Sequence, residues 1–232
     1  HGVSAVLVCP AGGLEGRGGV NEKLNVLIAL SMGLNLVALG TGRLPSLIRI
    51  AAVQGVVLGI MPLVMEQEVR VILFLMAVAT AVIKGVVIPA LLRRAMRAAN
   101  IDRDLYPLMG FLPSLLVGAA GIIVAVVVAG RLPLLPDHRS TLVVAGSLAS
   151  VFTGFLLLIG RSEAISQVCG YLILENGIYL FGVMLVHSVP LLVEGGILLD
   201  LTVAVFVTGI IVDRIQRAFD TLDTRKLTVL RE

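Results

Sequence analysis

The sequence predicts an all-α integral membrane protein with about seven transmembrane helices. Of its 232 residues, 58% are hydrophobic and 14% are charged, and the mean hydropathy is +1.04, a composition outside the range of soluble domains. At roughly 30 residues for a spanning helix and its loop, the length allows about seven spans and leaves no room for a soluble domain. Uncharged stretches of spanning length also recur along the chain. The lipid bilayer is therefore expected to surround most of the protein.

Seven uncharged stretches are the expected spans, and short loops separate them. The second is the least regular, because Arg49 lies in its first turn and Pro62 near its end, so a shallower or tilted segment is the alternative. Pro45 and four later prolines are expected in the loops, where a missing backbone N–H does least harm. The expected spans are Leu24–Gly40, Leu47–Met65, Val71–Leu92, Met109–Ala129, Thr141–Gly160, Ala164–His187 and Leu191–Val212.

The composition divides the chain into three parts. Residues 1–21 are glycine-rich and weakly apolar, and the run Val3–Val8 is shorter than the core of a secretory signal, so we expect a disordered or spurious leader. Residues 22–139 hold four spans, and residues 140–232 hold three more and a basic tail. The basic residues are scattered over short loops and form no cluster, so a nucleic acid is not an expected partner.

The distribution of lysine and arginine predicts the orientation of the chain in the membrane. Most basic residues fall on the side that includes the C-terminal tail, which makes this side cytoplasmic and puts the N-terminus outside by the positive-inside rule. The expected cytoplasmic residues are Arg43, Arg49, Arg93, Arg94, Arg97, Arg103, Arg161, Arg214, Arg217, Arg225, Lys226 and Arg231, and the expected outer ones are Arg17, Lys23, Arg70, Arg131 and Arg139.

Lys84 belongs to neither side, because it lies inside the third span. Its Cα is about 13 Å from the basic cluster at Arg93, whereas a lysine stem reaches only ~6 Å, so simple snorkelling is strained. A lysine that tilts its helix or sits at a water-filled dent is one interpretation. The other is a proton or charge relay answered by a neighbouring carboxylate. Pro89 would loosen the helix there and make local hydration easier.

Three carboxylates, Glu175, Glu194 and Asp200, lie in the last two expected spans, where there is no lysine or arginine. A charge near the bilayer centre costs at least ~2.5–3.5 kcal/mol, so such acids usually face other helices or water and carry protons or ions. Glu175 is near the middle of its span, beside Asn176. A permanently neutral acid that donates an interhelical hydrogen bond is the alternative for Glu175. Asp200 is deeper than Glu194, which could instead be an interfacial acid at a helix N-terminus.

The remaining candidate is His187, close to the outer interface. It is either an interfacial residue or an entry group for protons.

The sequence contains no P-loop, HExxH, CxxC or GxSxG motif in a suitable context, so catalysis by this chain alone is not expected. Its two cysteines, Cys9 and Cys169, are far apart and indicate neither a disulfide framework nor a metal site. We expect no cofactor and no metal. The Gly55–Gly59 and Gly146–Gly154 segments predict close helix packing.

The last three expected spans resemble the hydrogenase-4 component E family. The resemblance rests on ISQVCGYLILENGIYLFG, PLLVEGGILLDLTVAVFVTGI and the basic tail, and it extends back through VIKGVVIPALLRR, so that it covers residues 22–232. Through that family, the three spans are similar to the K subunit of respiratory complex I and to the C subunit of Mrp-type cation/proton antiporters. Glu175 matches the acid of the middle K-type helix. Glu194 and Asp200 compete for the second acid, and the gap between the two acids is shorter here than in the K subunit.

The resemblance implies a non-catalytic membrane subunit of a group 4 [NiFe]-hydrogenase or formate hydrogenlyase-type complex. Such a complex would lie in the cytoplasmic membrane of a bacterium or archaeon, with antiporter-like membrane subunits as partners. Its carboxylates and Lys84 would help to move protons, or other ions, during electron transfer. The alternatives are a structural scaffold of the same complex, a subunit of an Mrp-like antiporter, and an independent solute carrier, which the lack of an inverted repeat disfavours.

Overall fold

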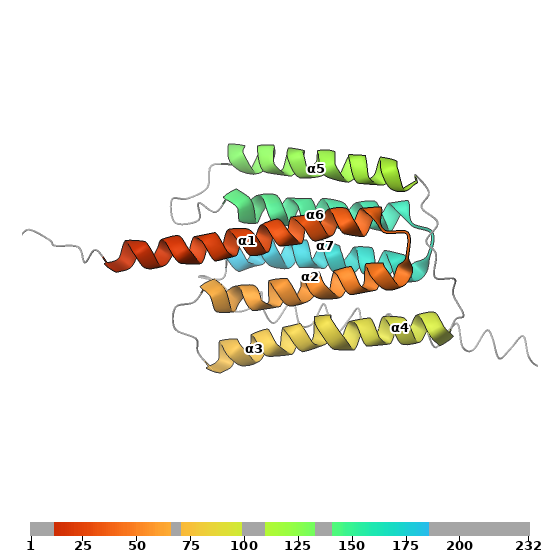
Figure 1. Cartoon of the computed structure of the whole chain (residues 1–232), viewed down its shortest axis with the longest axis horizontal. Coiled ribbons are helices and arrows are strands. Elements are labelled where there is room, and N and C mark those ends of the chain that lie inside the picture. Colours follow the sequence, from red (N-terminus) through yellow and green to blue (C-terminus); the bar gives the residue numbers. More distant parts are fainter. Residues whose placement is uncertain (1–11, 66–70, 99–109, 133–140, 186–232) are drawn as a thin grey trace, which may run out of the picture.

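The protein is a bundle of long helices that run side by side (Figure 1). The computed structural model describes residues 12–65, 71–98, 110–132 and 141–185, and these are helical almost throughout. The helices are α1 (Gly12–Gly40), α2 (Leu44–Met65), α3 (Val71–Val82), the π-helix η1 (Ile83–Val87), α4 (Ile88–Ala98), α5 (Phe111–Arg131), α6 (Thr141–Gly160) and α7 (Ala164–Leu185).

The helices confirm the predicted class of all-α membrane protein. Five segments of the described chain are long and apolar enough to cross a bilayer: Glu22–Gly40, Leu44–Val64, Phe74–Arg97, Phe111–Arg131 and Leu142–Gly160. They correspond to the first five expected spans. The sixth expected span corresponds to α7, whose 22 residues are long enough to cross a bilayer, although it is not one of these five segments. The seventh expected span lies outside the described residues.

Two helix ends differ from the sequence-based expectation. Helix α1 begins at Gly12, inside the stretch expected to be a leader, and no proline between Gly12 and Gly40 interrupts it. The placement of Pro45 in a loop was wrong, because Pro45 lies in the first turn of α2. A first-turn proline is well tolerated, since its missing N–H would have no partner within the helix. Helix α2 also continues through Pro62 as one regular element.

Helices α1, α2, α6 and α7 form the inner bundle, with α5 on one side and the α3–η1–α4 segment on the other (Figure 1). The most extensive contact joins α6 and α7. A methyl group built on Gly154 would lie 2.5 Å from the backbone N of Leu174, and one on Gly177 would lie 2.7 Å from that of Val151. Glycine therefore allows the two backbones to touch, which confirms the close packing predicted for this part of α6.

The third span is one continuous helix whose middle widens into η1. The backbone N–H of Ile88 bonds to the carbonyl of Ile83, an i to i+5 pairing. Pro89 follows directly, and its missing N–H cannot bond to the carbonyl of Gly85 as an α-helix would require. Because the α-helical ladder is already interrupted here, the wider turn is a local adjustment of the helix to its proline.

Two apolar clusters fill the inner bundle and its contact with the third span, and a layer of buried polar side chains lies between them. One cluster, which includes Leu39, Ile48, Leu92 and Ile173, occupies one end, and the other, which includes Ile28, Met61 and Leu180, occupies the opposite end. We call the side chains between them the polar layer: Ser31, Asn35, Gln54, Thr80, Lys84, Ser147, Ser150, Thr153, Glu175 and Asn176, all buried.

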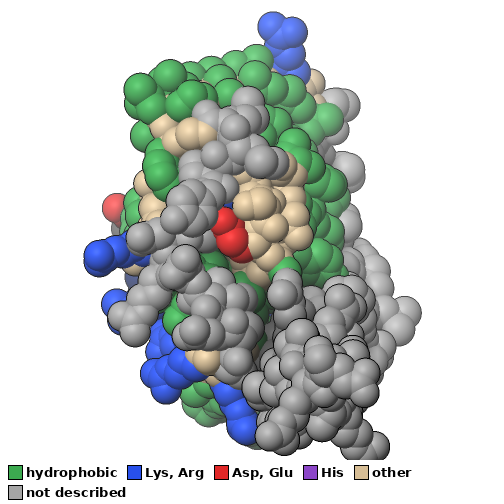
Figure 2. All heavy atoms as spheres, turned by 90° about the vertical axis from the view of Figure 1, so that its right-hand side faces the viewer, with side chains coloured by type: hydrophobic (Ala, Val, Ile, Leu, Met, Phe, Trp, Pro, Cys, Tyr) green, Lys and Arg blue, Asp and Glu red, His purple; other side chains and the backbone are tan. Residues whose placement is uncertain are grey.

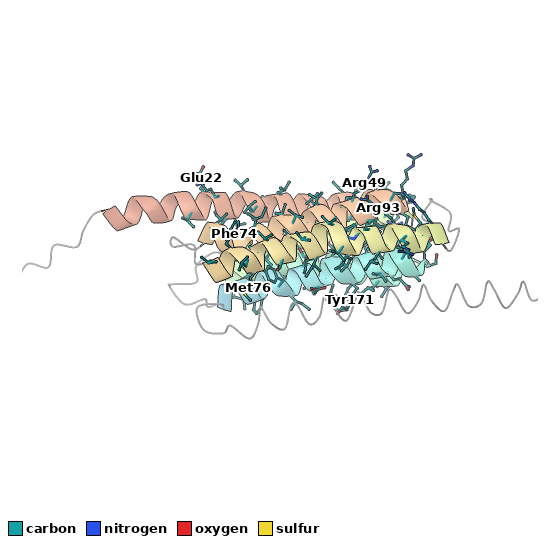
Figure 3. The ribbon with its side chains drawn as sticks, turned by 90° about the horizontal axis from the view of Figure 1, so that it is seen from below. Glu22, Arg49, Phe74, Met76, Arg93 and Tyr171 are labelled. Atoms are coloured by element: carbon teal, nitrogen blue, oxygen red, sulfur yellow. The ribbon has the colours of Figure 1, made fainter. Side chains whose placement is uncertain are left out.

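One end of the bundle carries most of the basic residues of the described chain. Figure 3 places Arg49 and Arg93 together near this end, away from Glu22 and Phe74. In a view onto the same end, Lys and Arg side chains protrude around it while hydrophobic side chains cover the flanks (Figure 2). This separation of charge from the apolar flanks is typical of a protein whose ends reach the two membrane surfaces.

Arg161 is a buried residue that connects several helices at this basic end. Its side chain is 2% exposed, and Nη2 donates to the carbonyls of Leu39 at 3.0 Å and Thr41 at 3.3 Å, at the C-terminus of α1. The guanidinium also lies 5.1 Å from the ring centroid of Phe111. Burial lowers the pKa of Arg161 from its ordinary value, and the nearby carboxylate of Glu163 opposes this shift. Arg161 thus joins α1, α5 and the α6–α7 turn.

Candidate functional site

The polar layer contains a buried ion pair between Lys84 and Glu175. Lys84 Nζ lies 2.9 Å from Glu175 Oε1 and donates a second hydrogen bond, 3.0 Å long, to Asn176 Oδ1. The two charged side chains are 7% and 3% exposed. The ammonium also lies 5.5 Å from the ring centroid of Tyr179, one helical turn after Glu175. The structure therefore brings together three of the residues singled out in the sequence, from two spans that are far apart in the chain.

Both members of the pair lie near the middle of their long helices. Lys84 is close to the centre of the apolar segment Phe74–Arg97, and Glu175 is at the centre of α7. At this depth neither group reaches bulk water by extending its side chain, so each charge depends on its partner. Pairing explains how a lysine and a glutamate are both accommodated there, which neither could achieve alone.

Local backbone features on two helices position Lys84. The π-helix η1 carries it, and the widened turn sets the direction in which the side chain leaves the helix. Gly55 of α2 provides the space, because a methyl group built on it would lie 2.8 Å from Lys84 Cβ and 3.3 Å from Cδ. The stem of the lysine thus crosses the backbone of α2 in close contact on its way to α7.

A second, neutral part of the polar layer lies on the other side of α2. Gln54 Nε2 donates to Ser31 Oγ at 3.0 Å and to Asn35 Oδ1 at 2.9 Å, and it lies 3.4 Å from Ser150 Oγ. Asn35 Nδ2 donates to the same Ser150 Oγ at 2.9 Å. We call these four side chains the neutral network. It links α1, α2 and α6, and all four members are fully buried.

The neutral network escaped the sequence analysis. Serine, asparagine and glutamine inside a span cost far less than a charge, so they gave no energetic signal comparable to that of Lys84. Ser150 lies within the Gly146–Gly154 segment, for which the sequence indicated only close helix packing. The available signal was the position of two polar residues at the centres of apolar segments. Gln54 lies at the centre of Leu44–Val64, and Ser31 lies at the centre of Glu22–Gly40.

The other predicted site residues, Glu194, Asp200 and His187, lie outside the described residues. Their relation to the Lys84–Glu175 pair stays a prediction, as does the choice between Glu194 and Asp200. Among the described residues, no three His, Cys, Asp or Glu side chains are grouped as a metal site. The described site offers a carboxylate, an ammonium and neutral hydrogen-bonding groups, all of which can take part in proton exchange.

Comparisons with known proteins find the chain similar to a mycobacterial protein and to hydrogenase-4 component E of enteric bacteria. It is 32% identical over 192 residues to a protein of Mycobacterium tuberculosis (strain ATCC 25618 / H37Rv) named uncharacterized protein Rv0085. The aligned region covers 82% of this chain and 87% of that protein. It is 29% identical over 163 residues to hydrogenase-4 component E of Escherichia coli (strain K12), 68% of this chain and 74% of that protein. The values for the protein of the same name from Shigella flexneri are identical. No family model and no solved structure matches the chain.

Proposed function

This chain belongs to the hydrogenase-4 component E family, and from that membership we propose that it is a membrane subunit of a hydrogenase complex that helps to translocate protons. In this proposal the redox chemistry takes place in other subunits, and antiporter-like membrane proteins are the neighbours of this chain. The basic end faces the cytoplasm. The observation that carries the proposal is the Lys84–Glu175 ion pair at mid-membrane depth.

The pair supports the proposal because its two charges are strongly coupled. At 2.9 Å and an effective dielectric constant of ~20, the Coulomb energy of two unit charges is about 6 kcal/mol. Protonation of Glu175 would therefore weaken the hold on the Lys84 ammonium and favour either its movement or the loss of its proton. A proton that arrives at one group changes the occupancy of the other, which is the elementary step of a relay.

Asn176 and Tyr179 support the same step. When Glu175 is neutral, the ammonium of Lys84 still has Asn176 Oδ1 as an acceptor and the ring of Tyr179 beside it. These contacts moderate the cost of the intermediate state, in which one charge of the pair has been lost. We further propose that Glu194 or Asp200 receives the proton next and that His187 lies at the outer entrance, as the sequence predicted.

A scaffold is the second candidate, because the ion pair lies wholly within one chain and joins α7 to the third span. A pair with that role would fix the packing of the helices and would carry no protons. The two candidates differ in what they predict for a variant that keeps the hydrogen bonds of Glu175 but cannot ionise.

The Glu175→Gln variant of the whole complex, reconstituted in liposomes, separates the two candidates. The measurement is the number of protons translocated per electron, with electron transfer measured alongside. The relay predicts that translocation falls sharply while electron transfer continues. Full translocation by an assembled Glu175→Gln complex would refute the relay and leave the scaffold.

Glu163→Gln is the matched control, because Glu163 lies just before α7 and outside the polar layer. Its carboxylate accepts hydrogen bonds from Ser162 and Ser166, which a glutamine oxygen can also accept. The same change of an acid into an amide at this end of the helix should leave the proton count unchanged.

A further inference from the structure

Two buried oxygen atoms near Ser150 have no hydrogen-bond partner among the described residues. They are Gln54 Oε1 and Thr153 Oγ1, and both side chains are 0% exposed. Gln54 is a member of the neutral network, and Thr153 lies three residues after Ser150 on α6. Residues three apart on a helix have Cβ atoms only ~5–6 Å apart, so both oxygens belong to one region around Ser150.

A buried polar atom without a partner loses about 1–3 kcal/mol of hydrogen bonding, and native proteins commonly satisfy such atoms with internal water. We propose that Gln54 Oε1 and Thr153 Oγ1 bind internal water, which makes the neutral network a hydrated extension of the Lys84–Glu175 site toward α1 and α6. The role as an extension rests on the proposed function, whereas the water site itself does not.

The architecture of α2 connects the two parts of the polar layer. Gln54 and Gly55 are consecutive, so Gln54 turns toward α1 and α6 while Gly55 lies against the stem of Lys84. The two parts of the polar layer therefore meet at consecutive residues of α2. Apolar clusters close it on both sides, which would confine water to this layer.

Water fits the site better than a dehydrated cation does. A sodium ion requires several oxygen atoms with free lone pairs pointing at one position. In the neutral network the oxygens of Asn35, Ser31 and Ser150 already accept from amide N–H groups, and no carboxylate is among them. Water can donate to Gln54 Oε1 and exchange hydrogen bonds with a hydroxyl, so it satisfies both oxygens without breaking the network.

The first test is a cryo-electron microscopy map of the whole complex at a resolution that shows ordered water. The expected result is a density peak ~2.6–3.2 Å from Gln54 Oε1. The proposal is overturned if water is resolved elsewhere in the membrane region but not here, or if the amide of Gln54 is turned so that its oxygen accepts from a protein donor. A peak that appears only with added sodium would also overturn it, in favour of a cation.

The second test uses Thr153→Val, with Thr153→Ser as the matched variant that keeps the hydroxyl. In a dry site the valine removes an unsatisfied hydroxyl and should raise the melting temperature of the complex. In a hydrated site it removes a ligand of water and should lower that temperature, and Thr153→Ser should retain the water peak. A melting temperature raised by Thr153→Val would refute the water site.

The functional role is tested by proton translocation in the same Thr153→Val complex. We expect the rate to fall roughly tenfold, which corresponds to about 1.4 kcal/mol on the barrier. If Glu175→Gln stops translocation but Thr153→Val leaves it unchanged, the relay stands and the extension fails. If water is present at Gln54 and Glu175→Gln translocates normally, the proposed function fails and the water site stands.

Discussion

A double-mutant cycle on Lys84 and Glu175 offers the most quantitative check of the buried pair. The variants are Lys84→Met, Glu175→Gln and the combination of the two. Each single variant leaves one ionisable group buried without its charged partner, which costs ~3–5 kcal/mol in proteins generally. The combination removes both charges, and its cost should be close to zero because the desolvation of two ions is no longer required.

The structure sets the size of the expected coupling. The side chains are 7% and 3% exposed and their charged atoms are 2.9 Å apart, which gives an attraction of about 6 kcal/mol at an effective dielectric constant of ~20. Desolvation opposes this attraction, so most of the cost of a single variant comes from the stranded partner. Lys84→Met additionally removes the donor to Asn176 Oδ1 and should be the less stable of the two.

The assay is the apparent melting temperature of the purified complex. Melting is detected by the loss of this subunit from the complex. With roughly 2–4 °C per kcal/mol for a chain of this size, each single variant should melt about 10 °C lower, and the combination within a few degrees of the natural protein. Proton translocation should stay low in all three. A combined variant as unstable as the sum of the single variants would show that the two groups do not interact and would refute the reasoning.

Two further predictions concern packing around the site and at the basic end. Gly55→Ala places a methyl group 2.8 Å from Lys84 Cβ, an overpacking that should cost ~1–3 kcal/mol and reduce translocation, as measured by melting temperature and liposome assays. Gly59→Ala is its control, since there the nearest neighbour is 3.4 Å away, and equal effects at the two glycines would contradict the packing account. Arg161→Gln removes a charged donor to the α1 carbonyls and should destabilise the complex by ~1.5–3 kcal/mol, with the number of protons per electron unchanged in the assembled fraction. A changed ratio would place Arg161 in the proton path.

The sequence predicted the class of fold and the charged part of the site because both carry large energies. Uncharged stretches of sufficient length predict spanning helices, and a lysine near the middle of a span is costly without a compensating group. Glu175 was a candidate for that group because of its depth, its neighbour Asn176 and the family resemblance. The atom that Lys84 contacts and the role of Asn176 as a second acceptor required the packing of α7 against the third span.

Features with smaller energetic signals were missed. The widened turn η1 depends on how the helix accommodates Pro89, which the sequence indicated only as a loosened region. Gln54 and Asn35 are 19 residues apart in the chain and lie on separate helices, so their hydrogen bond follows from the α1–α2 hairpin and not from any local motif. The start of α1 at Gly12 also differs from the expectation, because a glycine-rich composition lowers helix propensity without preventing a helix.

The central claim, that Glu175 changes its protonation state during turnover, can be observed directly by infrared difference spectroscopy of the complex in membranes. A proton relay predicts a carboxylic acid C=O band that appears or disappears when electron transfer starts, that is absent in Glu175→Gln and that persists in Glu163→Gln. A difference spectrum in which the natural complex and Glu175→Gln are the same in this region would contradict the account.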